Sequence, residues 1–531
     1  MSKVLISDKL SPRAAEIFRE SGVEVDEKVG MTPEELIACI GEYDGLAIRS
    51  ATKVTEAVLD AAKNLKVIGR AGIGVDNVDI PAATKRGIVV MNTPFGNTIT
   101  TAEHAISLMF ALARQIPAAD ASTKASKWEK SKFMGVEVTG KTLGVIGCGN
   151  IGSIVAERGV GLRMKVIVFD PFLSADRAAD LGVEPVELDA LLARSDFITL
   201  HTPLTDQTRN IINADAIAKM KDGVRIINCA RGGLVVEDDL VAALKSGKVA
   251  GAALDVFAKE PAKDNPLFAF EQVVATPHLG ASTSEAQENV ALQVAEQMSA
   301  YLVNGAVANA LNMPSISAED APKLRPYIKL AEQIGSFAGQ ITETGLRRVD
   351  IEYEGHAAEL NTRPLNAIVL QGLLSPLLDS SVNMVNAPLI ARERDIQVSE
   401  TKHDKESDYH TLMRLTVHTQ NRSRSISGTL FADRNPRIVE INGITVEAEV
   451  ASSMLFVTND DKPGFIGALG TILGQAGVNI ATFHLGRSRN SEDGALALVC
   501  VDQPPPQGVI EKICALPDVR QAKVLKFDGV V

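Results

Sequence analysis

Short apolar runs alternate with amphipathic stretches along the first hundred residues. The runs are almost continuously apolar, which is typical of parallel strands buried on both faces of a sheet. The strands predicted in this way are 3–7, 22–26, 45–49, 65–69 and 88–92, and the helices between them are 12–21, 33–40, 55–62 and 80–86. This βα alternation predicts an open α/β sheet.

The same rhythm restarts at Gly140 and predicts a second, larger α/β unit with helices between its strands. Its predicted strands are 142–146, 165–169, 196–200, 224–228, 249–257 and 272–276. Two long helical patterns, 100–116 and 283–303, stand on either side of this unit. We interpret them as the connectors between the two α/β units.

The pattern changes after Pro314. Helices are predicted near 322–341, 362–374 and 385–391, and antiparallel strands follow, with Asn442-Gly443 as a hairpin turn. The segment 391–410 is highly charged and is expected to be exposed. The final residues, 452–531, follow the order βαββαβ, which resembles a ferredoxin-like unit. The predicted fold class is therefore α/β, with two Rossmann-like parallel-sheet domains followed by an α+β domain and a ferredoxin-like βαββαβ domain.

Composition narrows the function classes. The chain has 531 residues, with 54 Lys and Arg against 66 Asp and Glu, which gives a net charge of −12. We therefore expect no nucleic-acid partner and no anionic-membrane partner, because either would need a basic surface. No apolar run reaches the ~18 residues of a membrane span. The five cysteines show no CxxC spacing, so we expect a reducing, cytoplasmic location and no metal site.

The most specific local motif is GCGNIG (147–152), which directly follows a predicted strand and opens a helix. Gly147 allows a tight turn, Gly149 lets a pyrophosphate approach the backbone, and Gly152 allows the helix to pack closely on the strand. Asp170 ends the next predicted strand, where a carboxylate accepts hydrogen bonds from ribose hydroxyls and repels a 2′-phosphate. The motif therefore predicts that the cofactor is NAD rather than NADP.

Three polar residues, Arg231, Glu260 and His278, each follow a predicted strand, at the edge where open α/β sheets bind ligands. A histidine can take the proton of a hydroxyl, a carboxylate can fix the histidine's tautomer, and an arginine can hold a substrate carboxylate through two hydrogen bonds. This set suits the oxidation of a 2-hydroxy acid. Each residue alone also has a structural interpretation, in packing or in an ion pair, and the spacing leaves both open.

With these motifs, residues 1–314 resemble the D-isomer-specific 2-hydroxyacid dehydrogenase family. The resemblance is carried by GRAGIGVDNVD (69–79), GKTLGVIGCGNIG (140–152), NCARGGLVVEDDL (228–240), LDVFAKEP (254–261) and TPHLGAS (276–282). It implies that His278 is the general acid/base, Glu260 its partner and Arg231 the anchor of the substrate carboxylate. The NAD contacts that it implies, beyond the three glycines, are Asn150, Ile151, Asp170, Thr202, Cys229, Asp255, Gly280 and Ala281.

The resemblance also implies a discontinuous fold, with the NAD-binding domain inserted into the substrate-binding domain. The expected domains are a flavodoxin-like substrate-binding domain of residues 1–98 and 281–314, an NAD-binding Rossmann domain of 99–280, an intervening domain of 315–451 and an ACT regulatory domain of 452–531. The ACT resemblance is carried by NDDKPGFIGALGTILGQAGVNI (459–480).

Long members of the family that end in an ACT domain oxidise 3-phosphoglycerate to 3-phosphohydroxypyruvate, the first step of the phosphorylated pathway to serine. The whole chain resembles these enzymes, which implies the same substrate and reaction. The implied substrate contacts are Arg49, Ser50, Gly74 and Arg231. In WEKSKFMG (128–135), Lys130 and Lys132 are expected to help hold the phosphate of a neighbouring subunit's substrate.

Regulation is implied in the same way. Asp461, Gly464 and Asn479 would hold serine between two paired ACT domains, and such pairing implies a homodimer or homotetramer. Asn459 departs from the pattern, because a related long enzyme carries an aromatic residue there.

In the intervening domain, a basic patch either binds an anionic effector or is simply a solvated face. Its residues are Arg422, Arg424, Arg434 and Arg437.

Two other functions stay open at this point. A hydroxypyruvate or glyoxylate reductase of the same family would need no phosphate on its substrate and would leave the C-terminal domains unexplained. An NAD-sensing module like the corepressors with this dehydrogenase core would keep similar Arg, Glu and His residues. The ACT-like segment favours a regulated pathway enzyme over that module.

Overall fold

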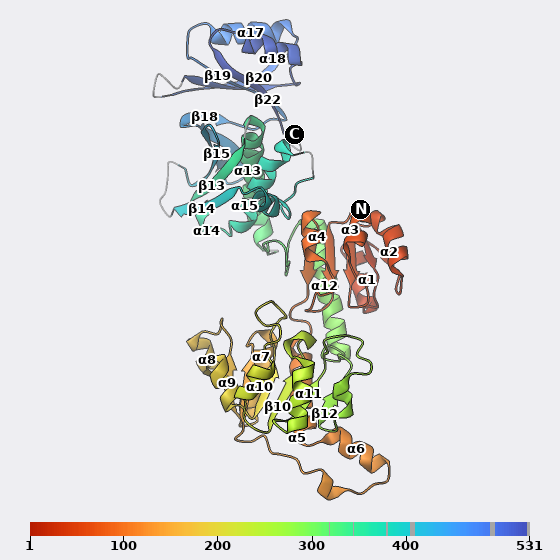
Figure 1. Ribbon diagram of the computed structural model, residues 1–531. Coiled ribbons are helices and arrows are strands. Elements are labelled where there is room, and N and C mark those ends of the chain that lie inside the picture. The colour runs from red at the N-terminus through yellow and green to blue at the C-terminus, as the bar shows by residue number, and fades with distance from the viewer. Residues whose placement is uncertain (318, 343–344, 379–380, 404–408, 489–493, 528–531) are drawn as a thin grey trace.

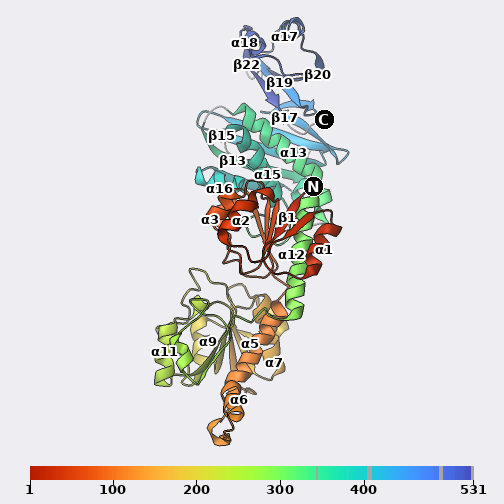
Figure 2. The same ribbon diagram turned by 90° about the vertical axis from the view of Figure 1, so that its right-hand side faces the viewer.

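The computed structural model describes residues 1–317, 319–342, 345–378, 381–403, 409–488 and 494–527. Four sheets form an elongated molecule, and their order in space differs from their order in the chain (Figure 1). The five-stranded N-terminal sheet lies between the seven-stranded sheet and the two C-terminal sheets (Figure 2). Two parallel sheets, one mixed sheet and one antiparallel sheet confirm the predicted fold class. Within the described ranges, no helix is both long and apolar enough to cross a bilayer.

The N-terminal sheet is parallel and has the strand order β2-β1-β3-β4-β5, which is the flavodoxin-like order. Its strands are β1 (Lys3–Ile6), β2 (Glu24–Glu27), β3 (Gly45–Ile48), β4 (Val67–Arg70) and β5 (Val89–Asn92). Helices α1 (Pro12–Glu20) and α12 (Ser284–Asn304) bury one face of this sheet. The other face is covered by α2 (Pro33–Cys39), α3 (Glu56–Ala61) and α4 (Ile80–Lys85).

Helix α12 shows that the chain returns to the N-terminal sheet after the second α/β unit. A methyl group added to Gly69 of β4 would lie 2.1 Å from the sulfur of Met298 and 2.6 Å from Val294 on α12. Glycine in β4 therefore allows the helix to approach the sheet closely. The exact limits of the domains stay predictions.

The seven-stranded sheet is also parallel, with the order β12-β11-β10-β9-β6-β7-β8. Its strands are β6 (Thr142–Ile146), β7 (Lys165–Phe169), β8 (Glu184–Pro185), β9 (Phe197–Leu200), β10 (Val224–Asn228), β11 (Val249–Leu254) and β12 (Val273–Ala275). The helices packed around it include α5 (Thr98–Ala113), α7 (Asn150–Gly161), α8 (Ala175–Leu181), α9 (Leu188–Arg194), α10 (Ala214–Lys219) and α11 (Glu237–Ser246). The strand order reverses between β6 and β9, and such a switch point is where open α/β sheets bind dinucleotides.

Two local details of this unit differ from the sequence prediction. The helix predicted over 100–116 ends at Ala113, because Gln115 takes a left-handed conformation (φ 55°) and Pro117 opens a new helix, α6 (Ile116–Lys124). Strand β8 was not predicted, since two residues are too short to show an alternation. Helix α6 buries none of its residues and projects from the lower end of the molecule (Figure 1).

The third sheet has the order β14-β13-β15-β16-β17-β18 and is antiparallel except for the parallel pair β13/β14. Its strands are β13 (Leu346–Gly355), β14 (Gln397–His403), β15 (Thr411–Thr419), β16 (Ser423–Phe431), β17 (Asn435–Ile441) and β18 (Ile444–Ala448). The predicted turn at Asn442-Gly443 joins β17 to β18, with both residues at positive φ. The sequence prediction missed β13 and β14. Strand β14 is polar and lies at the sheet edge, so no apolar run marks it.

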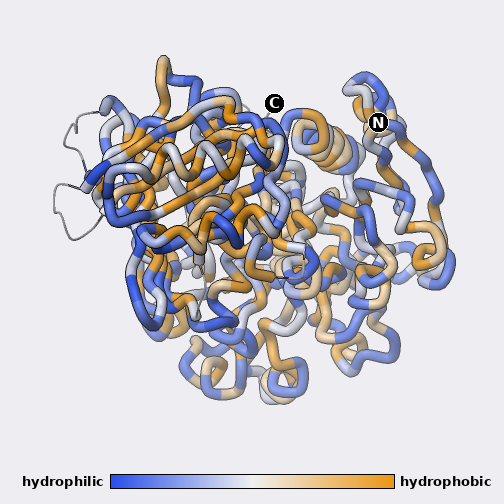
Figure 3. The backbone as a smooth tube through the Cα atoms, turned by 90° about the horizontal axis from the view of Figure 1, so that it is seen from above, coloured by the Kyte–Doolittle hydropathy of each residue, from blue (hydrophilic) through white to orange (hydrophobic). Residues whose placement is uncertain are grey.

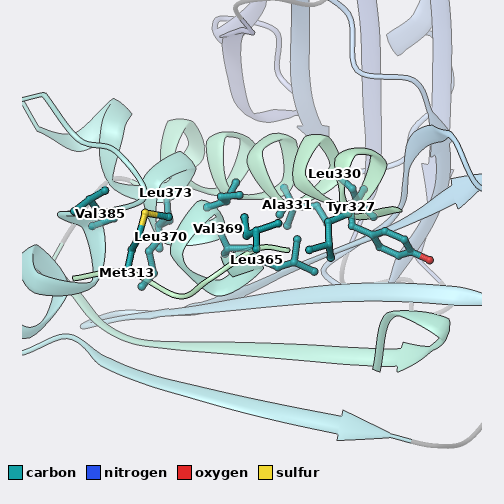
Figure 4. Packing of buried hydrophobic residues seen from close by; sticks show 14 of the residues in the cluster. Met313, Tyr327, Leu330, Ala331, Leu365, Val369, Leu370, Leu373 and Val385 are labelled. Atoms are coloured by element: carbon teal, nitrogen blue, oxygen red, sulfur yellow. The ribbon is translucent and has the colours of Figure 1, made fainter. Parts of the chain in front are cut away.

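Helices α13 (Asp320–Ile341) and α15 (Arg363–Leu374) pack together on this sheet, beside α14 (His356–Glu359) and α16 (Ala387–Glu393). Figure 4 shows Leu330 and Ala331 of α13 directed toward Leu365 and Val369 of α15. A methyl group on Gly335 of α13 would lie 2.4 Å from the carbonyl oxygen of Val369. The two helices can therefore cross this closely because α13 carries a glycine at the crossing.

The C-terminal sheet is antiparallel and has the order β20-β21-β19-β22, as the ferredoxin-like βαββαβ prediction requires. Its elements are β19 (Ser453–Asn459), α17 (Phe465–Gln475), β20 (Ile480–Arg487), β21 (Ala495–Val501), α18 (Gln507–Cys514) and β22 (Val519–Lys526). Seen from above, short apolar and polar stretches alternate along the backbone (Figure 3). Phe337 of α13 meets Phe456 of β19 edge to face at 5.8 Å, so this sheet shares a core with the third one.

Candidate active site

A cleft of about 880 Å³ opens at the carboxyl ends of the strands of the N-terminal sheet, on the side that faces the seven-stranded sheet. Arg49 follows β3, Arg70 ends β4, and His278 follows β12 of the other sheet. Because parallel strands present all their carboxyl ends at one edge, residues far apart in the chain meet here. The lining also includes the predicted residues Ser50, Glu260 and Ala281.

Arg49 sits on a loop that a buried aspartate holds in place. One carboxylate oxygen of Asp8 accepts hydrogen bonds from the backbone N–H of Arg49 (2.6 Å) and of Thr52 (3.1 Å), and the other accepts one from the Thr52 hydroxyl (2.7 Å). The Asn77 side-chain amide donates to the carbonyls of Arg49 and Thr52, both at 2.7 Å. The loop therefore has a defined backbone before any ligand binds.

Arg70 is a site residue that the sequence reasoning did not single out. Burial, and after it the positive charges of Arg231 and Arg49, lowers the pKa of its guanidinium to about 10. Its Nε is buried and has no hydrogen-bond partner among the described residues. Arg49 and Arg70 line the cleft, and Arg231 is close enough to act on the charge of Arg70. This concentration of positive charge suits a ligand with more than one negative charge. In the sequence, Arg70 could have been identified by its position in GRAGIGVDNVD, directly after a predicted strand.

The structure brings His278 and Glu260 together. The imidazole Nδ1 lies 2.7 Å from Glu260 Oε2, and Glu260 Oε1 accepts the backbone N–H of Phe257 at 3.0 Å. His278 itself has a positive φ of 56°, and its backbone N–H donates to the Asp255 carbonyl at 2.9 Å. With Nδ1 taken by the carboxylate, Nε2 is the ring nitrogen left for a ligand in the cleft.

Arg231 follows β10 and reaches the N-terminal sheet. Its Nε lies 3.1 Å from Asp76 Oδ2, and its Nη1 donates to the Ala230 carbonyl at 2.7 Å. A methyl group on Gly74 would lie 2.0 Å from Arg231 Nη2, so a side chain at the predicted residue Gly74 would displace the Arg231 guanidinium. Arg231 itself is not part of the cleft lining, whereas its partner Asp76 is.

The glycine motif has the geometry that its sequence predicts. Gly147 has a φ of 91°, and a methyl group on Gly152 would lie 1.9 Å from the Gly147 carbonyl oxygen. A methyl group on Gly149 would meet nothing within 4 Å, so this backbone stays open to a ligand. Asn150 and Ile151 form the first turn of α7, which directs its free N–H groups toward the same place.

Two further observations fit a dinucleotide at this loop. Thr202 Oγ1 is buried and has no hydrogen-bond partner among the described residues. Asp170 accepts the backbone N–H groups of Cys148 (2.6 Å) and Phe172 (2.8 Å), which fixes the carboxylate at the end of β7. Cys229 is buried, and burial first, then Asp255, raises the pKa of its thiol. The Cys229 thiol therefore contributes packing and is not a nucleophile.

Asp255 is fully buried and holds the turn that carries His278. Its carboxylate accepts the Thr276 hydroxyl (2.6 Å) and the N–H groups of Leu279 (2.7 Å) and Gly280 (2.8 Å). Burial alone would raise the pKa of Asp255, but the hydrogen bonds, first from His104, keep the pKa below its usual value. The structure thus gives Asp255 contacts within the protein, and its predicted contact with NAD stays a prediction.

The predicted effector residues lie in the C-terminal sheet region. Asp461, at a φ of 50°, forms an ion pair with Arg487 at 2.8 Å, and Gly464 stands at a φ of 99° directly before α17. The Asn479 side chain donates to Asp502 at 2.8 Å. Asn459 is buried and accepts the backbone N–H of Asp461 at 3.1 Å, so it supports the loop from inside.

The two predicted phosphate lysines lie away from the cleft of their own chain. Lys130 and Lys132 belong to the segment after α6, at the lower end of Figure 1, and Lys132 pairs with Glu271 at 3.3 Å. In the part of the chain that the structure describes, no cluster of three or more His, Cys, Asp or Glu side chains is placed to hold a metal ion.

Comparison with known proteins agrees with this architecture. Family models match the NAD-binding domain of D-isomer-specific 2-hydroxyacid dehydrogenases at residues 106–280, the D-3-phosphoglycerate dehydrogenase intervening domain at 323–442 and the ACT domain at 453–518. Among solved structures, D-lactate dehydrogenase from Aquifex aeolicus, complexed with NAD and lactic acid, is 27% identical with a TM-score of 0.53. It covers 59% of this chain and 100% of its own. Fold and site thus define an NAD-binding dehydrogenase.

Curated relatives extend the similarity to the full length. A D-3-phosphoglycerate dehydrogenase from Synechocystis is 45% identical over 528 residues, which cover 99% of this chain and 95% of the relative. The one from Archaeoglobus fulgidus is also 45% identical, over 99% of this chain and 100% of its own length. The chain therefore belongs to the D-isomer-specific 2-hydroxyacid dehydrogenase family and, within it, to the D-3-phosphoglycerate dehydrogenases.

The Arg70 guanidinium gives a testable prediction, because its low pKa means that the folded protein destabilises this cation. We expect Arg70→Met to raise the free energy of unfolding of the ligand-free protein by about 1–3 kcal/mol and to weaken binding of an anionic substrate. Thermal unfolding and KM measure the two effects. Arg86→Met is the matched control, since a hydrogen bond from Asp60 raises the pKa of Arg86. A loss of stability in the Arg70 variant would contradict this account.

Proposed function

We propose that the protein oxidises the C2 hydroxyl of 3-phosphoglycerate to 3-phosphohydroxypyruvate with NAD, the first step of the phosphorylated pathway to serine. The observation that carries this proposal is the cleft in which His278, paired with Glu260, faces Arg49 and Arg70. The names of the full-length relatives support the same substrate. A small substrate with a phosphate at one end and a carboxylate at the other fits this distribution of charge.

His278 acts as the general base in the proposed reaction. Its neutral ring donates Nδ1–H to Glu260 at 2.7 Å, which leaves Nε2 to accept the proton of the C2 hydroxyl. The Glu260 carboxylate then stabilises the imidazolium that forms. When bound, NAD supplies the acceptor for the hydride from C2.

The arginines bind and orient the substrate. Arg231, from the seven-stranded sheet, holds the carboxylate, while Arg49, with the neighbouring Ser50 and Arg70, holds the phosphate. Both ends are then fixed by charge-assisted hydrogen bonds, which aligns C2 with His278. The pyrophosphate of NAD would lie on the backbone of Gly149 and the first turn of α7, with Asp170 at the ribose.

The two rival functions are not favoured. A hydroxypyruvate or glyoxylate reductase would not need Arg49 and Arg70, and the intervening and ACT domains would have no role in it. An NAD-sensing module would keep similar Arg, Glu and His residues, so it is the ACT domain, which suits control of a pathway enzyme, that argues against it. The full-length relatives are named as dehydrogenases, and this chain matches the models of the intervening domain and the ACT domain.

Regulation and assembly are also proposed. The ACT domain supports control by a small effector, and we propose serine, held by Asp461, Gly464 and Asn479.

Association with a second copy, as a homodimer or homotetramer, is supported by the projecting α6 and by the exposed Trp128 and Met134 after it. In this assembly Lys130 and Lys132 reach the partner's cleft. A cytoplasmic location is supported by five free cysteines.

A substrate panel tests the proposed reaction. We expect NADH formation to be fastest with 3-phosphoglycerate, slower with D-glycerate and D-lactate, and inhibited by serine. The reverse assay uses hydroxypyruvate and glyoxylate with NADH. Equal or better activity on the unphosphorylated acids would favour the reductase instead, and unchanged turnover and thermal stability at saturating serine would refute the regulatory part.

His278→Asn tests the assignment of the base. Because asparagine cannot take the hydroxyl proton, we expect kcat to fall by roughly 10³-fold, while NADH affinity, measured by fluorescence, stays within about twofold. His356→Asn, at an exposed histidine of α14, is the control and should keep full activity. Retained turnover in the His278 variant would refute the assignment.

A further inference from the structure

Arg231 is held by an acidic residue of the opposite sheet. The arginine follows β10 of the seven-stranded sheet, and Asp76 lies in the loop after β4 of the N-terminal sheet. Arg231 Nε and Asp76 Oδ2 are 3.1 Å apart. This ion pair therefore joins the two sides of the site. Neither the motifs nor the general acid/base pair gives Asp76 a role.

The contacts of the guanidinium divide its hydrogen-bond donors. Nε points to Asp76, and Nη1 donates to the Ala230 carbonyl at 2.7 Å. Nη2 lies against Gly74, where even a methyl group would be only 2.0 Å away. The plane of the group is thus fixed on one side, and Nη2 with the second hydrogen of Nη1 is the edge that stays available for a carboxylate.

We propose that Asp76 is a positioning residue for Arg231, which orients the guanidinium edge that receives the substrate carboxylate. This inference rests on the proposed oxidation of a 2-hydroxy acid, in which Arg231 is the carboxylate anchor. Asp76 acts through Arg231 and does not need to touch the substrate.

The loop that carries Asp76 is itself well fixed. The Val75 carbonyl accepts the N–H of Val78 at 2.9 Å, and the Asn77 carbonyl accepts the N–H of Val54 at 2.8 Å. The Asn77 side chain also clamps the loop of Arg49 through two hydrogen bonds of 2.7 Å. Asp76 therefore links the carboxylate anchor to the loop of the proposed phosphate anchor and helps to set the distance between them.

Electrostatics alone makes the opposite prediction for Asp76. A carboxylate that lines an anion-binding cleft repels the substrate, so removing its charge would strengthen substrate binding. If Asp76 positions Arg231, removing the charge weakens binding, because the guanidinium loses its orientation. The sign of the change in KM therefore separates the two explanations.

The experiment compares Asp76→Asn with Asp79→Asn in steady-state kinetics. We expect D76N to raise KM for the hydroxy acid by about tenfold or more, with KM for NAD within twofold and an unchanged melting temperature. Asp79 lines the same cleft and caps α4 through the Ala82 N–H, and asparagine keeps this cap. D79N removes the same charge and should leave KM unchanged or lower it. An unchanged or lower KM in D76N would overturn the proposal.

A second background tests whether Asp76 acts through Arg231. Lysine has no Nε–H edge for Asp76 to orient, so D76N should change KM by less than twofold in an R231K enzyme. A full tenfold effect in that background would also overturn the proposal. All variants are assayed with the 2-hydroxy acid that the wild-type enzyme oxidises fastest. The identity of that acid tests the proposed function, whereas the ratios of KM between the variants and their parent enzymes test the role of Asp76.

Discussion

The site depends on the placement of like charges around one cleft. Burial and the charges of Arg49 and Arg231 lower the pKa of Arg70 to about 10, so the folded chain holds these guanidinium groups together against their repulsion. Asp8 and Asn77 help to stabilise this arrangement. Their hydrogen bonds fix the backbone of the Arg49 loop and do not involve the Arg49 side chain. In the proposed reaction, an anionic substrate relieves this repulsion, so that a few local cations bind an anion within a chain of net charge −12.

The fold brings these charges together from two parallel sheets. Arg49 and Arg70 follow neighbouring strands of the N-terminal sheet, while Arg231 and His278 follow strands of the seven-stranded sheet. Away from the cleft, one cluster of buried side chains runs from β1 through α13 to Phe456 of β19. The ACT domain is therefore packed against the rest of the chain through a continuous core rather than attached by a flexible linker.

The sequence was most informative where a function depends on neighbouring residues. The turn at Gly147, the open backbone at Gly149 and the close packing at Gly152 were all predictable because strand, turn and helix are consecutive. The approach of His278 to Glu260 was suggested by their places after strands. Arg70, Asp8 and Asp76 were not singled out, since their roles arise from contacts between distant loops. Strand β14 was missed because a polar edge strand leaves no hydrophobic pattern, and the break at Gln115 because it depends on one backbone angle.

The most direct measurement of the central claim is the preference for a phosphorylated substrate in an Arg49→Met enzyme. The quantity is the ratio of kcat/KM for 3-phosphoglycerate to kcat/KM for D-glycerate, which lacks only the phosphate. If Arg49 binds the phosphate of the substrate, the ratio falls by about tenfold to a hundredfold, while kcat/KM for D-glycerate stays within about threefold. An unchanged ratio, or an equal loss on both substrates, would contradict the account.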